Sequence, residues 1–159
     1  ALSDLLIDSL NHYCAFYDLD DEVIYDLLDE GVLFEDNYEQ KYSKLKSISS
    51  KGLMHHKYCV FDERYVLTGS WNPTQRGTNV NDNYILFIDS KKIAQAFLDE
   101  YVYLQNRDVS VSALHVLSKN YSVNVYFCPQ HNCQEKVLSE LKKATRSVLT
   151  GHIAALLFL

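Results

Sequence analysis

Apolar and polar residues alternate along the chain in short blocks whose spacing predicts helices interleaved with strands. Leucines at helical spacing predict a helix over 2–11, and an acidic start closed by Gly31 predicts another over 20–30. Amphipathic patterns predict two further helices over 91–105 and 133–146. Short apolar runs predict strands over residues 12–17, 32–34, 56–61, 65–68, 84–88 and 123–127.

The same pattern predicts which positions are buried and where the loops lie. The run 84–88 is apolar throughout and is expected to form a buried strand. Polar segments predict loops over 38–51 and 69–83, and residues 62–64 predict a turn between two strands. The residues expected to face the core are Ile93, Ala96, Phe97, Val102 and Leu104 in one helix and Val137, Leu138 and Leu141 in the last.

Helices that alternate with apolar strands indicate an α/β or α+β class, in which helices cover a sheet. The segment from Glu135 to Val148 resembles the opening of the chain, because an amphipathic helix again leads toward an apolar run. We interpret this similarity as an internal repeat that is cut short.

Composition and charge narrow the class of protein. The chain has 159 residues, of which 47% are apolar, so it can bury a core and is not a disordered or fibrous chain. The first 39 residues hold 12 of the 21 acidic residues and no Lys or Arg. The net charge of −6 therefore comes from this segment, and the rest of the chain has a positive net charge. Five lysines and no carboxylate lie between Lys41 and Lys57, and this segment is compatible with a phosphate-containing partner.

The two ends of the sequence suggest a fragment or a processed chain. It begins with Ala and ends in the apolar run 153–159. An acidic amino terminus does not match a signal peptide, and no apolar stretch reaches the ~20 residues of a membrane helix. A cytoplasmic location is therefore the favoured expectation.

The four cysteines fall into two groups. Cys14 and Cys59 lie in apolar, strand-like segments and are expected to be buried free thiols. Cys128 and Cys133 lie in the sequence CPQHNC, which fits a local disulfide, a partial metal site with His131, or a turn with free thiols.

The strongest chemical signal is a motif of six positions, H-x-K-x4-D-x6-G-S-x-N. Its members are His55, Lys57, Asp62, Gly69, Ser70 and Asn72. His55 and Lys57 are two residues apart, so on a strand both side chains leave the same face. A neutral imidazole can attack phosphorus, while a lysine beside it holds the phosphate oxygens.

The remaining polar members of the motif complete a site for phosphate. Ser70 and Asn72 add hydroxyl and amide donors, and Gly69 allows a tight backbone turn where the strand meets the loop. Together these groups would stabilise the charge on a phosphoryl group during its transfer.

This motif resembles that of the phospholipase D superfamily, the HKD phosphodiesterases, and most closely its small single-motif and nuclease-like members. Residues 53–107 resemble one repeat of that family, and the preceding helix-strand-helix resembles its opening. The resemblance implies a mixed β-sheet flanked by helices, with one complete repeat and the start of a second. We therefore expect a domain over 1–107, a linker over 108–122 and an incomplete second repeat over 123–159.

The resemblance also implies a role for each residue of the motif. His55 matches the nucleophile that forms a phosphohistidine, and Lys57 matches the phosphate-binding lysine. Ser70 and Asn72 match the residues that line the phosphate pocket. Asp62 matches the aspartate of the motif, whose expected role is structural.

The same resemblance implies one further site residue, a carboxylate, and a reaction without cofactors. In nuclease-like members a Glu about ten residues beyond the Asn orients the nucleophile, and Asp82 occupies that place, one methylene shorter. The mechanism requires no metal and no cofactor.

The family pairs two motifs, because a second His protonates the leaving oxygen, whereas this chain has one motif. His56 should point to the opposite strand face, so the second His is expected from a homodimer partner or from a missing second half. The activity expected first is phosphodiester hydrolysis of nucleic acid. The alternatives are phospholipid hydrolysis or phosphatidyl transfer, and a non-catalytic fragment that binds phosphate.

Overall fold

The computed structural model describes residues 12–16, 32–34, 46–47, 55–119 and 121–147. The helices expected over 2–11 and 20–30 and most of the loop expected over 38–51 lie outside these residues. The chain divides into two compact units, residues 1–125 and 126–159. Within the described part of the chain, no helix is long and apolar enough to cross a membrane.

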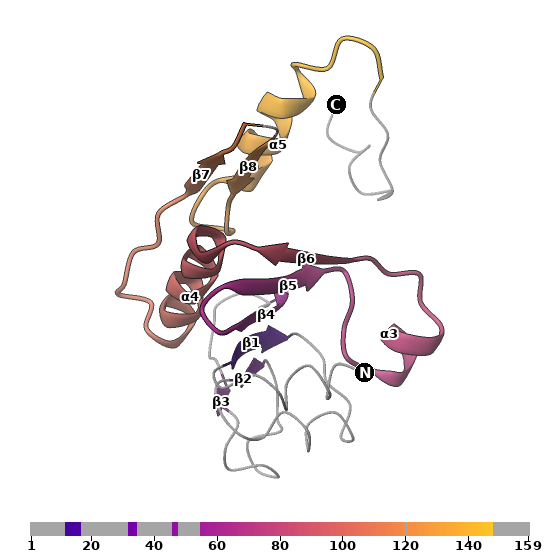
Figure 1. Cartoon of the computed structure of the whole chain (residues 1–159), viewed down its shortest axis with the longest axis vertical. Coiled ribbons are helices and arrows are strands. Elements are labelled where there is room, and N and C mark those ends of the chain that lie inside the picture. The colour runs from indigo at the N-terminus through magenta and orange to yellow at the C-terminus, as the bar shows by residue number, and fades with distance from the viewer. Residues whose placement is uncertain (1–11, 17–31, 35–45, 48–54, 120, 148–159) are drawn as a thin grey trace. The chain divides into compact units, whose positions relative to one another are not determined.

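The first unit contains a six-stranded mixed sheet (Figure 1), which confirms the predicted class. Its strands are β1 (His12–Phe16), β2 (Val32–Phe34), β3 (Lys46–Ser47), β4 (Lys57–Phe61), β5 (Tyr65–Gly69) and β6 (Ile85–Asp89). The order across the sheet is β3-β2-β1-β4-β5-β6. The first three strands pair in parallel, and β4, β5 and β6 continue the sheet through antiparallel pairing.

The central antiparallel strands β4 and β5 are joined by the predicted turn. Asp62 and Glu63 both have a φ of 51° there, which lets the chain reverse in three residues. Because the two strands run in opposite directions, the beginning of β4 lies beside the end of β5, with Tyr58 opposite Thr68. Residues that precede β4 and residues that follow β5 therefore meet at one end of the sheet.

Helix α4 (Lys91–Gln105) has the predicted bounds and packs on the strands β1, β4 and β5. The Ser90 hydroxyl caps it by accepting a hydrogen bond from the Ile93 amide. Ile93, Ala96, Phe97 and Leu104 are buried as predicted, together with Ala94, Glu100 and Tyr101. The prediction for Val102 is wrong: it is half-exposed, because it lies about 140° around the helix from Phe97.

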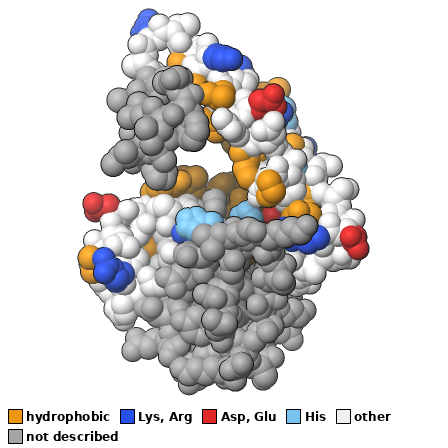
Figure 2. All heavy atoms as spheres, turned by 180° about the vertical axis from the view of Figure 1, so that it is seen from behind, with side chains coloured by type: hydrophobic (Ala, Val, Ile, Leu, Met, Phe, Trp, Pro, Cys, Tyr) orange, Lys and Arg blue, Asp and Glu red, His pale blue; other side chains and the backbone are white. Residues whose placement is uncertain are grey.

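Strand β6 differs from its prediction as a buried strand. Tyr84, Ile85, Leu86 and Phe87 are each between 49% and 61% exposed, although all four are large and apolar. The strand forms the edge of the described sheet and pairs with β5 alone, so it gains cover from one neighbour instead of two. Figure 2 shows that apolar side chains reach the surface of the described part on the face that it draws.

Two segments expected to be irregular contain regular structure. The predicted loop over 69–83 holds the short helix α3 (Gln75–Asn79), whose cap is the Thr74 hydroxyl. The predicted linker over 108–122 holds β7 (Leu114–Leu117), which pairs with β8 (Ser122–Val125) in an antiparallel hairpin. The division into a repeat, a linker and a second repeat stays a prediction.

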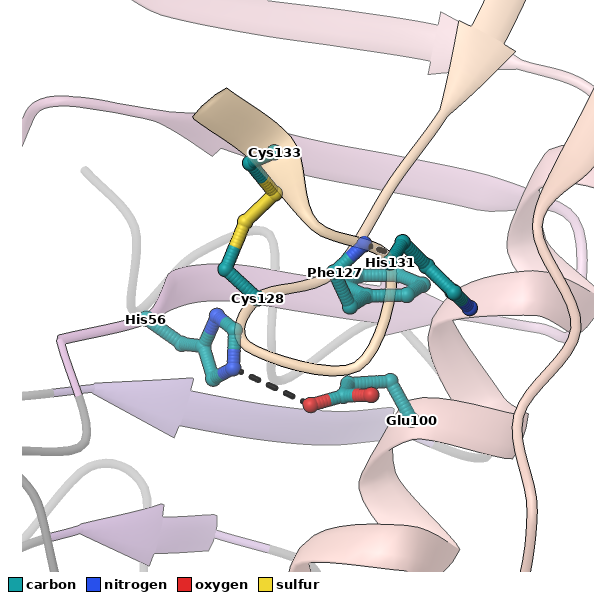
Figure 3. The surroundings of a disulfide bond; sticks show 6 residues. All are labelled: His56, Glu100, Phe127, Cys128, His131 and Cys133. Carbon is teal, nitrogen blue, oxygen red and sulfur yellow. Dashed lines mark hydrogen bonds and ion pairs between the residues drawn. A yellow bond between two sulfur atoms is a disulfide. The ribbon is translucent and has the colours of Figure 1, made fainter. Parts of the chain in front are cut away.

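The second unit contains α5 (Cys133–Leu141), which ends five residues before its predicted end. Val137 is exposed, against prediction, whereas Leu138 and Leu141 are part-buried. Of the alternatives for CPQHNC, the structure has the local disulfide between Cys128 and Cys133 (Figure 3).

Cys14 and Cys59 also form a disulfide, so their prediction as free thiols is wrong. The two residues lie directly opposite one another in the register of β1 and β4, with Cα atoms 4.1 Å apart. Pairing of strands 45 residues apart in sequence brings the thiols together, and the local apolar pattern does not reveal it.

Candidate functional site

The polar residues of the motif gather at the end of the sheet where β4 begins and β5 ends. His55 is exposed and lies two residues before the start of β4. The first residue of β4 is Lys57, which is 9% exposed. Ser70 and Asn72 follow directly after β5. A hydrogen bond of 3.0 Å from Thr68 Oγ1 to the Lys57 carbonyl oxygen ties the two strand ends together.

The amine of Lys57 lies against the imidazole of His55. Lys57 Nζ is 3.4 Å from Nδ1 and 3.3 Å from Nε2 of His55, and it donates to the His55 carbonyl oxygen at 3.4 Å. The two side chains therefore lie together, although His55 precedes the first residue of β4. This arrangement places the Lys57 ammonium group beside the imidazole nitrogens of His55, which suits the binding of an anionic phosphate ester.

Gly69 is required by its backbone conformation and by a close approach. Its φ is +152°, and a Cβ built there would lie 2.2 Å from the carbonyl oxygen of Tyr84. The neighbouring Ser70 amide donates to that same oxygen at 3.1 Å. A side chain at position 69 would therefore separate the end of β5 from the start of β6.

The side chain of Ser70 is held by the segment that leads into β6. Its hydroxyl donates to Asn83 Oδ1 at 2.9 Å and accepts from the Tyr84 amide at 3.2 Å. Asn83 also donates to the Gly77 carbonyl oxygen at 2.8 Å. Ser70 thus joins the motif to α3 through Asn83, a residue that sequence reasoning did not single out.

Asn72 is a part-buried residue at the same end of the sheet. Its Oδ1 atom is buried and has no hydrogen-bond partner in the described part of the chain. A buried polar atom without a partner costs roughly 1–3 kcal/mol. A hydrogen-bond donor that reaches this oxygen, from water or from a bound ligand, would remove that cost.

Two predicted site residues are not brought to His55. Asp62 lies in the turn after β4, about 16 Å along the strand from Lys57. This position fits the structural role expected for it. The carboxylate of Asp82 is exposed and makes no hydrogen bond or ion pair within the described residues.

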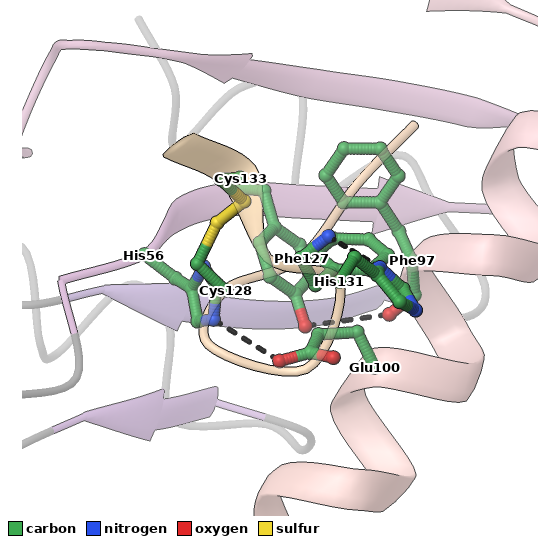
Figure 4. Close-up of polar contacts among 8 residues, drawn as sticks. His56, Phe97, Glu100, Phe127, Cys128, His131 and Cys133 are labelled. Carbon is green, nitrogen blue, oxygen red and sulfur yellow. Dashed lines mark hydrogen bonds and ion pairs between the residues drawn. A yellow bond between two sulfur atoms is a disulfide. The ribbon is translucent and has the colours of Figure 1, made fainter. Parts of the chain in front are cut away.

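Sequence reasoning missed a hydrogen-bonded pair of side chains formed by the residue next to His55. His56 Nε2 lies 3.1 Å from Glu100 Oε1 (Figure 4), and the Glu100 side chain is 1% exposed. As predicted, His56 points to the strand face opposite His55, and there it meets α4. A usable signal was the position of Glu100 on the apolar stripe of α4, three residues after Phe97.

A buried tyrosine completes the contact between β4 and α4. The Tyr58 hydroxyl donates to the Phe97 carbonyl oxygen at 3.3 Å, and the two rings meet edge to face at 4.9 Å. Burial raises the pKa of Tyr58 well above its ordinary value, and the carboxylate of Glu100 raises this pKa further. The tyrosine therefore stays neutral at physiological pH.

This fold is that of a phospholipase D-like domain. The family model described as "Cardiolipin synthase, PLD-like domain" matches residues 21–105, which is more than half of the chain. The chain therefore belongs to this family of phospholipase D-like domains.

Individual relatives are consistent with this assignment. Mitochondrial cardiolipin hydrolase from Xenopus tropicalis is 44% identical over 52 residues, which are 33% of this chain and 25% of that protein. A phospholipase D from Rickettsia prowazekii is 27% identical over 94 residues, covering 53% of this chain and 44% of that protein. The chain thus spans less than half the length of these curated relatives.

Two solved structures share the fold. NucT from Helicobacter pylori superposes with a TM-score of 0.54 at 15% identity, covering 70% of this chain and 87% of that chain. Nuc from Salmonella typhimurium, described as a phospholipase D family member, gives a TM-score of 0.53 at 19% identity, covering 79% and 90%. At these identities the similarity concerns the fold alone.

Proposed function

We propose that this chain hydrolyses phosphodiesters without a metal, through a phosphohistidine on His55. The observation that carries the proposal is the exposed His55 imidazole with the Lys57 amine 3.3 Å from its Nε2 atom. A ring nitrogen of His55 attacks phosphorus, and the bond to the leaving oxygen breaks as that oxygen gains a proton. Water then attacks the phosphohistidine, which releases a phosphomonoester and restores the imidazole.

The proton for the leaving oxygen requires a second acid. The chain carries one H-x-K motif, and His56 is paired with Glu100 on the far face of the strand. We infer that a second His comes from the partner in a homodimer or from a second half of a longer protein. An active dimer would support the first source, and a strictly monomeric, inactive chain would support a non-catalytic fragment that binds phosphate.

Nucleic acid is the substrate class we favour. The lysines between Lys41 and Lys57, a segment without carboxylates, lead toward the site, and they suit a polyanionic backbone. Phospholipid is the second candidate, because a relative is named a cardiolipin hydrolase and the apolar side chains of β6 are exposed near the site.

The variant His55→Asn tests the mechanism with bis(p-nitrophenyl) phosphate as substrate. Loss of the nucleophile should lower turnover on the order of a thousandfold. His115→Asn is the matched control, because His115 is exposed on β7. Undiminished turnover by His55→Asn would refute the phosphohistidine mechanism.

The substrate class is tested separately on the wild-type chain. Single-stranded oligonucleotides and cardiolipin vesicles are compared as substrates at several salt concentrations. Cleavage of oligonucleotides that weakens steeply with salt supports nucleic acid. Cleavage of vesicle lipid alone would favour the phospholipid candidate.

A further inference from the structure

We propose that Glu100, acting through His56, is a positioning residue for the nucleophile His55. This inference rests on the proposed function, because it concerns how His55 is aimed at phosphorus. The His56–Glu100 pair joins the residue next to the nucleophile to helix α4, 44 residues further along the chain.

The pair is anchored among buried residues of β4 and α4. Glu100 is fully buried on α4, between the buried residues Phe97 and Tyr101. The His56 ring meets the Tyr58 ring edge to face at 5.8 Å, and Tyr58 is itself hydrogen-bonded to the backbone of Phe97. The position of His56 is therefore set by groups that cannot shift without disturbing the core.

His55 lies outside the paired part of β4, two residues before its first residue. Strand β4 begins at Lys57, and the pairing of β4 with β1 ends with Lys57 opposite Phe16. Along an extended backbone, successive side chains leave opposite faces. Holding His56 on the α4 side consequently orients the backbone so that the His55 imidazole faces the Lys57 amine.

The chemistry of the pair favours a role in positioning over a role in stability. Burying a carboxylate and an imidazole costs desolvation free energy that their attraction offsets only in part. Replacing both members of such a pair by apolar residues of similar size is often neutral for stability or raises it, whereas removing one member costs stability. A fixed distance and direction between two polar atoms, however, is something that an apolar contact does not supply.

Three variants on α4 test the proposal in the full chain. Glu100→Leu removes the acceptor, Glu100→Gln keeps an oxygen that can accept from His56, and Tyr101→Phe is a control for packing on the same helix. With bis(p-nitrophenyl) phosphate, Glu100→Leu should lower kcat about ten- to a hundredfold with little change in KM. Glu100→Gln should retain most of the activity, and Tyr101→Phe should retain all of it.

A spectroscopic measurement reports on His55 independently of turnover. The imidazole Hε1 resonance of His55, identified by its loss in His55→Asn, should shift or broaden in Glu100→Leu and not in Glu100→Gln. If Glu100→Leu does not fold, His56→Gln and His56→Leu give the same comparison at a part-exposed position, since a Gln side chain can still donate to Glu100.

The outcomes separate this inference from the proposed function. A folded Glu100→Leu with wild-type kcat and an unchanged His55 resonance overturns the inference, and so does a rise in KM at constant kcat. If instead His55→Asn keeps full activity, the proposed function fails. The His55 resonance in Glu100→Leu then still decides whether the pair positions that residue.

Discussion

Replacing Gly77 with alanine tests how closely α3 packs on the loop that carries Asn72. A Cβ on Gly77 would lie 2.2 Å from the Asn72 carbonyl oxygen and 3.0 Å from Thr74 Oγ1. These atoms sit well inside the roughly 3.5 Å of a comfortable non-bonded contact, so one of them must move by about 1 Å. In an unobstructed helix the same substitution stabilises the protein by about 1 kcal/mol.

The cost at this position exceeds that gain. Overpacking typically costs about 1–3 kcal/mol. A shift of Gly77 also weakens the 2.9 Å cap bond from its amide to Thr74 Oγ1, which contributes roughly 0.5–2 kcal/mol. The net effect expected for Gly77→Ala is a loss of about 1–3 kcal/mol in the free energy of unfolding.

Thermal unfolding measures the effect. The melting temperature of Gly77→Ala should fall by about 3–10 °C relative to the wild type. Arg76→Ala, an exposed position on the same helix, is the control and should change stability by no more than about 0.5 kcal/mol. A melting temperature of Gly77→Ala equal to or above that of the wild type would refute this account of the loop.

Two further predictions concern the cysteines and the buried tyrosines. All four cysteines are in disulfides. Thiol titration of the unfolded chain should therefore find no free thiol before reduction and four free thiols after it. Free thiols before reduction would contradict the pairing. Burial raises the pKa of Tyr101 to about 12, above the value of about 10 in an unfolded chain. The neutral form is therefore favoured by folding, so this contribution to stability is complete below pH 10 and is lost as the pH rises toward 12. Tyr101→Phe should flatten the decline in melting temperature over this range, and an identical decline in both proteins would speak against the raised pKa.

Local signals predicted the elements whose ends are marked in the sequence. Helix α4 has a capping Ser90 at its start and an apolar period along its length, and its bounds agree with the prediction. The turn between β4 and β5 was predicted in the same way from Asp62, Glu63 and Arg64. Such features depend on neighbours in sequence, which the pattern contains.

Burial and pairing depended on partners far along the chain. The apolar run of β6 predicts a buried strand, yet its place at the sheet edge leaves it half-exposed. Cys14 and Cys59 look like separate core residues, yet the register of β1 and β4 sets them opposite one another. No local pattern distinguishes an edge strand from a central one, because the sheet order is set by the whole fold.

The sequence by itself predicted the chemistry of the candidate site, since the spacing of His55, Lys57, Ser70 and Asn72 resembles the motif of the phospholipase D family. Only the tertiary structure decided which distant residues lie around them. It paired His56 with Glu100 on α4, set Gly77 against the Asn72 carbonyl, and left Asp82 without a contact to His55. The motif can be recognised in the sequence because its polar residues lie close together along the chain. The residues that contact the motif and its neighbours are distant in sequence and meet them only after the strands pair and α4 packs.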